Sequence, residues 1–121
     1  MKELNKANNS DLIEAFIEND FAFEVFSQLS KEFSKIGVLI EFSDEELSSF
    51  DAFQKRLSDE LELVMRSSSH RIDQLLYVSD LSENQVRQVF DSHSNPVNQL
   101  AEMLLKRIAQ KVHFRRQYRK G

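Results

Sequence analysis

The chain has no cysteine, no tryptophan, two glycines and one proline among its 121 residues. Without cysteine the protein has no disulfide, no zinc site built on thiolates and no cysteine nucleophile. Sheet proteins need turn residues every few positions, so the scarcity of glycine and proline argues against them. It also leaves no glycine-rich phosphate-binding loop. The sequence therefore predicts an all-α protein whose helices are joined by short polar loops.

Long apolar runs are also missing. No stretch approaches the roughly 20 apolar residues of a membrane span, and residues 1–10 lack the apolar segment of a signal peptide. We therefore expect a soluble, cytoplasmic protein with no membrane span. With 40% hydrophobic residues, including ten phenylalanines, the chain is large enough to form the core of one domain.

The charge of the chain is divided unevenly along the sequence. Residues 1–105 carry nine Lys or Arg and all twenty Asp and Glu, a net charge of −11, whereas residues 106–121 carry seven Lys or Arg and no acid. Such an asymmetry is typical of a tail that meets an acidic partner.

The first third of the chain predicts two helices, because its apolar residues recur at helical spacing. We expect one over residues 10–18 and a second from Asp20, as N-cap, to Gly37, as C-terminal cap. Residues 1–9 have no pattern and are predicted to be disordered. A single helical domain is expected over residues 10–112, followed by a basic extension of the last helix over 113–121.

The run at residues 38–42 is rich in β-branched residues and looks like a strand. A lone strand has nothing to pair with inside a helical chain. We interpret it as an extended connector that packs its apolar side chains on the helices. The alternative is a short strand that pairs with its copy in a dimer.

A long helix is predicted over about 44–78. Ser43 and Glu46 have the spacing of a capping box, and the apolar residues from Leu47 to Leu76 keep one helical phase. The serines at 67–69 resemble a linker, but the phase continues across them. One helix is therefore the main prediction, and two helices with a break at 67–70 are the alternative.

The remaining sequence predicts two more helices. Ser82 and Gln85 form a second capping-box pattern and begin a short helix, and residues 91–95 are predicted to be a loop. Asn95 as N-cap and Pro96 at the first helical position begin the last helix, over about 96–117. The expected architecture is a bundle of about five helices, with 44–78 and 96–117 as its main pair.

The last helix changes character near its end. Its apolar stripe runs from Val97 to Val112, and Lys111, Arg115 and Arg119 then fall on the same arc. Because charged side chains are rarely buried without a partner, we expect the helix to leave the core near Val112.

The basic end of this helix is the candidate site, since arginines are interleaved there with aromatic residues. The candidate partner-binding residues are Lys111, Phe114, Arg115, Arg116, Tyr118, Arg119 and Lys120. We expect a non-catalytic protein-interaction module that binds another protein or a second copy of itself, for example as a homodimer. The alternative partner is RNA or single-stranded nucleic acid, because arginine pairs with phosphates and aromatic rings stack on bases.

Two patterns could suggest chemistry. His70 and Asp73 have a spacing that can hold a metal, and Asp91 and His93 could belong to a triad assembled in space. His70 lies opposite the apolar stripe with no second histidine nearby in the sequence, and a loop Asp commonly forms a local turn. We therefore predict no enzymatic activity, no metal site, no cofactor and no small-molecule substrate.

Two parts of the sequence resemble small uncharacterised bacterial proteins of helical type. The resemblance covers about residues 70–119. It lies in the segment 75–83 and in the pattern Leu100, Ala101, Arg107, Lys111, Arg115 and Tyr118. It implies a bacterial, cytoplasmic setting and carries no activity and no site residue.

Overall fold

The computed structural model describes residues 14–16, 20–92 and 94–120, without the side chains of Ser69, Ser92, Arg119 and Lys120. Within these ranges all regular secondary structure is helical, which confirms the predicted all-α class. The elements are α2 (Phe21–Lys35), α3 (Asp44–Leu47), α4 (Phe50–Ser67), α5 (Ser69–Val78), α6 (Glu83–Ser92) and α7 (Pro96–Lys120). Of the predicted helix 10–18, residues 14–16 are helical and the rest lies outside the described residues, as does the predicted disorder of 1–9.

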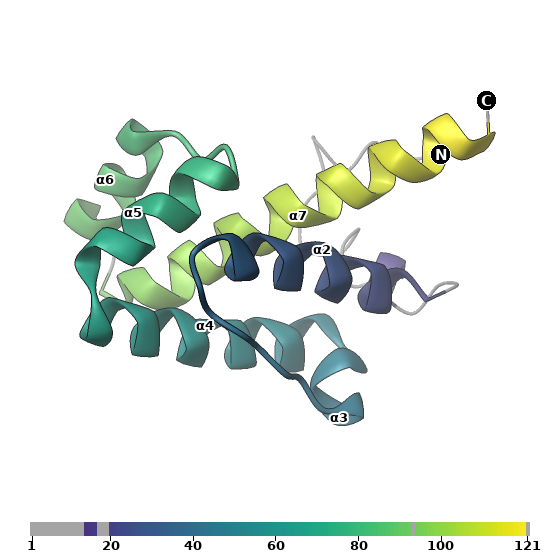
Figure 1. Cartoon of the computed structure of the whole chain (residues 1–121), viewed down its shortest axis with the longest axis horizontal. Helices are drawn as coiled ribbons and strands as arrows, with labels where there is room; N and C mark the ends of the chain where they lie inside the picture. The colour runs from purple at the N-terminus through teal and green to yellow at the C-terminus, as the bar shows by residue number, and fades with distance from the viewer. Residues whose placement is uncertain (1–13, 17–19, 93, 121) are drawn as a thin grey trace.

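Helix α7 is the longest element and runs along the whole bundle (Figure 1). It packs on α4, α2 and α6, and the last turns of its C-terminal end extend beyond the other helices (Figure 1). Its fully buried side chains are Leu100, Ala101, Leu104, Leu105, Ile108, Ala109 and Val112. The predicted main pair is therefore confirmed in its contacts, since Leu57 and Leu61 of α4 are fully buried as well.

Phenylalanines fill the part of the core between α2, α4 and the connector. The Phe16 ring lies 5.3 Å from the Phe53 ring, edge to face, and the Phe42 ring lies 5.0 Å from Phe53 on another side. Such edge-to-face pairs add a favourable quadrupole term to the burial of apolar area. Three phenylalanines lie outside the core, because Phe23, Phe90 and Phe114 are exposed.

The C-terminal end of α2 has the predicted glycine cap, whereas its N-terminal end lacks the expected side-chain cap. Val38 N donates to Phe33 O at 3.0 Å and Gly37 N to Ser34 O at 3.0 Å, with Gly37 at φ +78°. This is the double hydrogen bond of a glycine-ended helix, as predicted. Asp20 holds the N-cap position, but its φ of 61° differs from the extended backbone of a capping residue, and its side chain makes no capping hydrogen bond.

The prediction of one uninterrupted helix over 44–78 is wrong, because two serines divide it into α3, α4 and α5. Ser49 and Ser68 both have extended backbones and begin the next helix as N-caps: Ser49 Oγ accepts from Ala52 N at 3.1 Å and Ser68 Oγ from Arg71 N at 3.4 Å. Serine hydroxyls compete with the helical hydrogen-bond ladder for backbone N–H groups. The alternative prediction, a break at 67–70, is therefore confirmed.

The apolar phase survives these breaks because the helices still face one core. Val64 of α4 and Leu75 of α5 are both buried in it, and α5 packs on α4 and α2. Continuity of phase therefore did not require continuity of the helix. The predicted capping box of Ser43 and Glu46 is confirmed, with reciprocal hydrogen bonds of 3.2 and 2.8 Å.

The segment 38–42 is an extended connector, as the main interpretation held, and is not assigned as a strand. Ile40 is buried and Phe42 packs on Phe26 at 5.1 Å, whereas Leu39 is 82% exposed. The Arg56 guanidinium lies over the Phe42 ring, 5.3 Å from its centroid, and donates to Glu41 O at 3.4 Å. The connector is thus held by its alternate apolar residues and by one arginine.

The corner between α5 and α6 ends a helix without glycine. Leu81 N donates to Leu76 O at 3.0 Å and Asp80 N to Tyr77 O at 3.1 Å, with Asp80 at φ 61°. The pattern repeats that of Gly37, with an aspartate in the left-handed position that glycine usually takes. Helix α6 then continues to Ser92, so the predicted loop at 91–95 begins later than expected.

The last helix begins as predicted. Asn98 N donates to Asn95 Oδ1 at 3.3 Å and Pro96 is the first helical residue. It ends at Lys120, three residues beyond the predicted boundary.

Because α7 lies at the centre of the core, we expect Leu104→Ala to cause a large loss of stability. Leu104 is fully buried, so the change removes apolar contacts and leaves a cavity. The free energy of unfolding should fall by about 2–5 kcal/mol in urea denaturation. Leu39→Ala, at an exposed position of the connector, should change it by less than about 0.5 kcal/mol. Equal effects of the two changes would contradict this packing.

Candidate functional site

Three cations of the predicted site contact α2. Lys111 Nζ lies 2.9 Å from Glu32 Oε2, and Arg116 Nε lies 3.1 Å from Glu24 Oε2. Arg115 donates to the side-chain oxygen of Gln28. The Arg116 guanidinium also lies over the Phe21 ring, 5.2 Å from its centroid. The basic end of α7 is therefore neutralised in part by the acidic body of the same chain.

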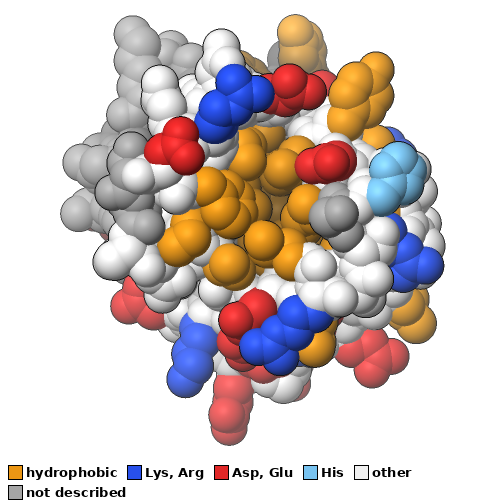
Figure 2. All heavy atoms as spheres, turned by 90° about the vertical axis from the view of Figure 1, so that its left-hand side faces the viewer, with side chains coloured by type: hydrophobic (Ala, Val, Ile, Leu, Met, Phe, Trp, Pro, Cys, Tyr) orange, Lys and Arg blue, Asp and Glu red, His pale blue; other side chains and the backbone are white. Residues whose placement is uncertain are grey.

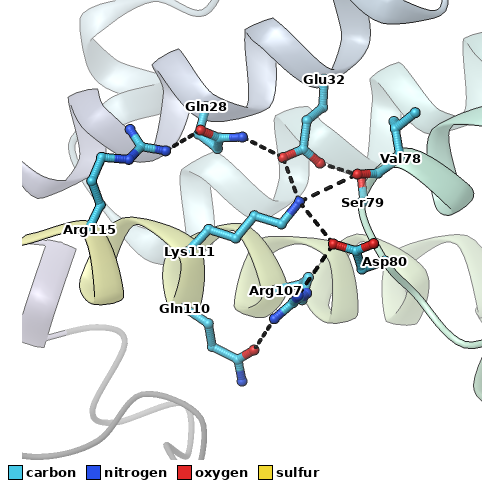
Figure 3. A network of polar contacts seen from close by, with 9 residues as sticks. All are labelled: Gln28, Glu32, Val78, Ser79, Asp80, Arg107, Gln110, Lys111 and Arg115. Atoms are coloured by element: carbon cyan, nitrogen blue, oxygen red, sulfur yellow. Dashed lines mark hydrogen bonds and ion pairs between the residues drawn. The ribbon is translucent and has the colours of Figure 1, made fainter. Parts of the chain in front are cut away.

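The Glu32 carboxylate is the most deeply buried charge among the described residues, with 1% of the residue exposed. Ser79 Oγ donates to Glu32 Oε1 at 2.5 Å, and Gln28 Nε2 donates to Oε2 at 2.6 Å (Figure 3). Together with the Lys111 ammonium, these donors satisfy both carboxylate oxygens. A buried charge is tolerated when it is paired and hydrogen-bonded in this way.

The same cluster fixes the corner between α5 and α6. Lys111 Nζ donates to Val78 O at 3.5 Å and lies 3.8 Å from Asp80 Oδ2. Arg107 Nη2 lies 3.4 Å from the same Asp80 oxygen, and its Nη1 donates to Gln110 Oε1 at 3.3 Å (Figure 3). One group of side chains thus joins α2, α7 and the corner residues 78–80. We call this group, Gln28, Glu32, Ser79, Asp80, Arg107 and Lys111, the Glu32 cluster.

Sequence analysis missed the partner of Lys111, although a signal was present. Glu32 falls at the edge of the apolar arc of α2, three residues after Leu29 and four before Ile36. Glu32 at the edge of the apolar stripe of α2 and Lys111 on the apolar stripe of α7 carry opposite charges. Matching the two would have predicted a buried ion pair between α2 and the last helix.

The remaining residues of the predicted site lie beyond the core. Val112 is the last buried residue of α7, where we expected the helix to leave the core. Phe114 is 45% exposed and Tyr118 85% exposed. The side chains of Arg119 and Lys120 lie outside those described. The structure therefore divides the predicted site into cations that fold back on α2 and an exposed aromatic pair.

A second surface lies at the opposite end of the molecule. Viewed from that end, apolar side chains gather in a hollow whose rim carries both acidic and basic side chains (Figure 2). The hollow opens where α5 and α6 lie, because α6 packs on α7 whereas α5 packs on α4 and α2. The elements that reach this end include partly buried apolar residues, among them Met65, Leu76, Val86 and Val97. We call this surface the α5–α6 hollow.

The hollow was not predicted from the sequence. A periodic stripe indicates which face of a helix is apolar, but not whether a neighbouring helix covers it. On α6, Val86 is only partly buried and Phe90 is exposed.

The candidate chemical groups form no shared site among the described residues. His70, Asp73 and Asp91 are exposed, and His93 lies outside the described residues. The described part of the chain contains no cluster of three or more His, Asp or Glu side chains placed to hold a metal ion. None of its helices has both the length and the apolar character that crossing a membrane would require.

Comparison of the chain with protein families, curated proteins and solved structures finds no match. The bacterial, cytoplasmic setting implied by the resemblance of residues 70–119 therefore stays an expectation.

The Glu32 cluster predicts a large loss of stability for Lys111→Met, because the change leaves a buried carboxylate without its cation. The free energy of unfolding should fall by roughly 3 kcal/mol in urea denaturation. Adding Glu32→Leu should restore part of that loss, since the second change removes the unpaired charge. Lys106→Met is the matched control, because Lys106 pairs with Glu102 within one helix surface at 3.1 Å. Equal losses for the two lysines would refute a special role of the buried pair.

The left-handed backbone of Asp80 predicts an order among its variants. Asp80→Gly and Asp80→Ala both remove the carboxylate that faces Arg107, so their difference isolates the backbone. At φ 61° alanine is strained and glycine is not, so Asp80→Ala should be less stable by about 1 kcal/mol. Thermal or urea unfolding of the pair measures the difference. An alanine variant as stable as the glycine variant would rule out backbone strain at this corner.

Proposed function

We propose that this chain is a non-catalytic protein-interaction module and that it binds its partner through the α5–α6 hollow. The observation that carries the proposal is the apolar hollow with its mixed charged rim (Figure 2). Apolar surface that stays open on a small folded protein commonly marks a binding site. A concave apolar surface between helices suits the apolar face of a partner helix.

The polar chemistry of the chain supports the same proposal. Ser79, Glu32 and Lys111 are the residue types of a hydrolytic site, and they are in hydrogen-bond contact. However, Ser79 is fully buried and Glu32 is nearly so, which leaves a substrate no access to the hydroxyl. Because these three side chains satisfy one another's hydrogen bonds, a structural role is favoured, in which they hold α2, α7 and the corner together.

Nucleic-acid binding through the basic end of α7 is the alternative, and the contacts of its cations weigh against it. A phosphate that approached Lys111 or Arg116 would compete with Glu32 and Glu24, which already pair with them. Phosphate contacts supply most of the sequence-independent affinity for nucleic acids. The proposal of a protein partner therefore takes precedence.

The test is a capture experiment with Val86→Asp, which places a charge at a partly buried apolar position of α6. Bound proteins should be lost from a cell-lysate capture, because a desolvated carboxylate without a partner opposes docking. Gln88→Asp, an exposed position of the same helix, adds the same charge and should capture like the unchanged protein. Nuclease treatment should make no difference. Capture that survives Val86→Asp but disappears with nuclease would favour the nucleic-acid alternative.

A further inference from the structure

The two exposed features of this chain lie at opposite ends of the molecule. The α5–α6 hollow occupies one end (Figure 2), and the C-terminal turns of α7 extend from the other (Figure 1). A single copy therefore cannot bring the two features together. Two copies arranged end to end can do so.

The projecting end of α7 has the shape of a helical ligand. Phe114 and Tyr118 are separated by four residues, so they lie one above the other on a single helix face. Both are exposed, Tyr118 by 85%. Anchors at this spacing are what a helix presents when it binds in an apolar groove. Aromatic side chains also supply much of the binding energy at protein interfaces.

The charges of the two ends are complementary. Residues 113–121 carry four Arg or Lys and no acid, whereas residues 69–92, which include α5 and α6, carry four acids and two arginines. Opposite net charges steer two surfaces together and disfavour contacts between like ends. Lys111, Arg115 and Arg116 already contact α2, and Asp80 already pairs with Arg107. Docking therefore leaves these contacts intact and uses the aromatic pair with the remaining charges of the two ends.

From these observations we infer that the occupant of the α5–α6 hollow is the C-terminal end of α7 from a second copy of this chain. The inference rests on the proposed function and names its partner. Because each copy offers a different surface to each neighbour, the contact is heterologous, and association continues beyond a dimer unless a ring closes. Phe114 and Tyr118 enter the hollow between α5 and α6, and the basic residues that follow meet the acids of these helices.

The experiment uses the full-length protein and two complementary variants. The end variant carries Phe114→Ser and Tyr118→Ser, and the hollow variant carries Val86→Asp. Sedimentation velocity over a range of concentrations should show the unchanged protein growing beyond a dimer. Each variant alone should stay monomeric. In the end variant the loss of interface aromatics raises Kd by roughly 30-fold or more, and in the hollow variant a desolvated carboxylate opposes docking. Circular dichroism and thermal unfolding confirm that each variant is folded, and Gln88→Asp should associate like the unchanged protein.

The decisive sample is an equimolar mixture of the two variants. It retains one intact α7 end and one intact hollow, so it should form a one-to-one heterodimer that grows no further. A mixture that stays monomeric overturns the inference. Self-association of the end variant, but not of the hollow variant, overturns it as well and indicates that two hollows meet across a twofold axis.

The failure of the inference is separable from failure of the proposed function. If the unchanged protein is monomeric at every concentration, a second copy is not the occupant. The lysate capture then decides whether the hollow binds another protein, since that binding should still depend on Val86. If neither self-association nor capture depends on Val86, the proposed function fails too.

Discussion

The buried Glu32 carboxylate is the constraint on which the arrangement of the helices depends. A charge with 1% exposure must be paired and hydrogen-bonded, or it costs several kcal/mol. Its donors come from three separate parts of the chain: Gln28 on α2, Ser79 after α5 and Lys111 on α7. Satisfying this one group therefore fixes the position of α2 and of the α5–α6 corner relative to α7.

The hollow follows from the same constraint. The corner at 78–80 is tied to α7 by Lys111 and Arg107, so α5 and α6 leave it from a fixed point. Helix α5 then packs on α4 and α2, while α6 packs on α7. The separation of the two helices leaves apolar side chains such as Leu76 and Val86 partly uncovered. A polar cluster inside the bundle thus determines the shape of an apolar surface outside it.

Ion pairs within the chain explain part of the uneven charge distribution of the sequence. Lys111 and Arg116 neutralise Glu32 and Glu24 on α2, and Lys106 pairs with Glu102. The first two of these ion pairs, between the basic tail and the acidic body, hold α7 on α2. Phe114 and Tyr118 of the tail stay exposed. The aromatic pair thus becomes the more informative part of the predicted site.

The sequence by itself determined the features that depend on neighbouring residues. Gly37 ends α2, Ser43 and Glu46 cap α3, and Asn95 with Pro96 begins α7, because each of these hydrogen bonds closes within a few residues. The tertiary structure decided the rest. Whether Ser68 interrupts a helix, whether Lys111 faces solvent or Glu32, and whether a neighbour covers Val86 depend on segments tens of residues away. A helical period reports which side of a helix is apolar, but packing alone decides what that side meets.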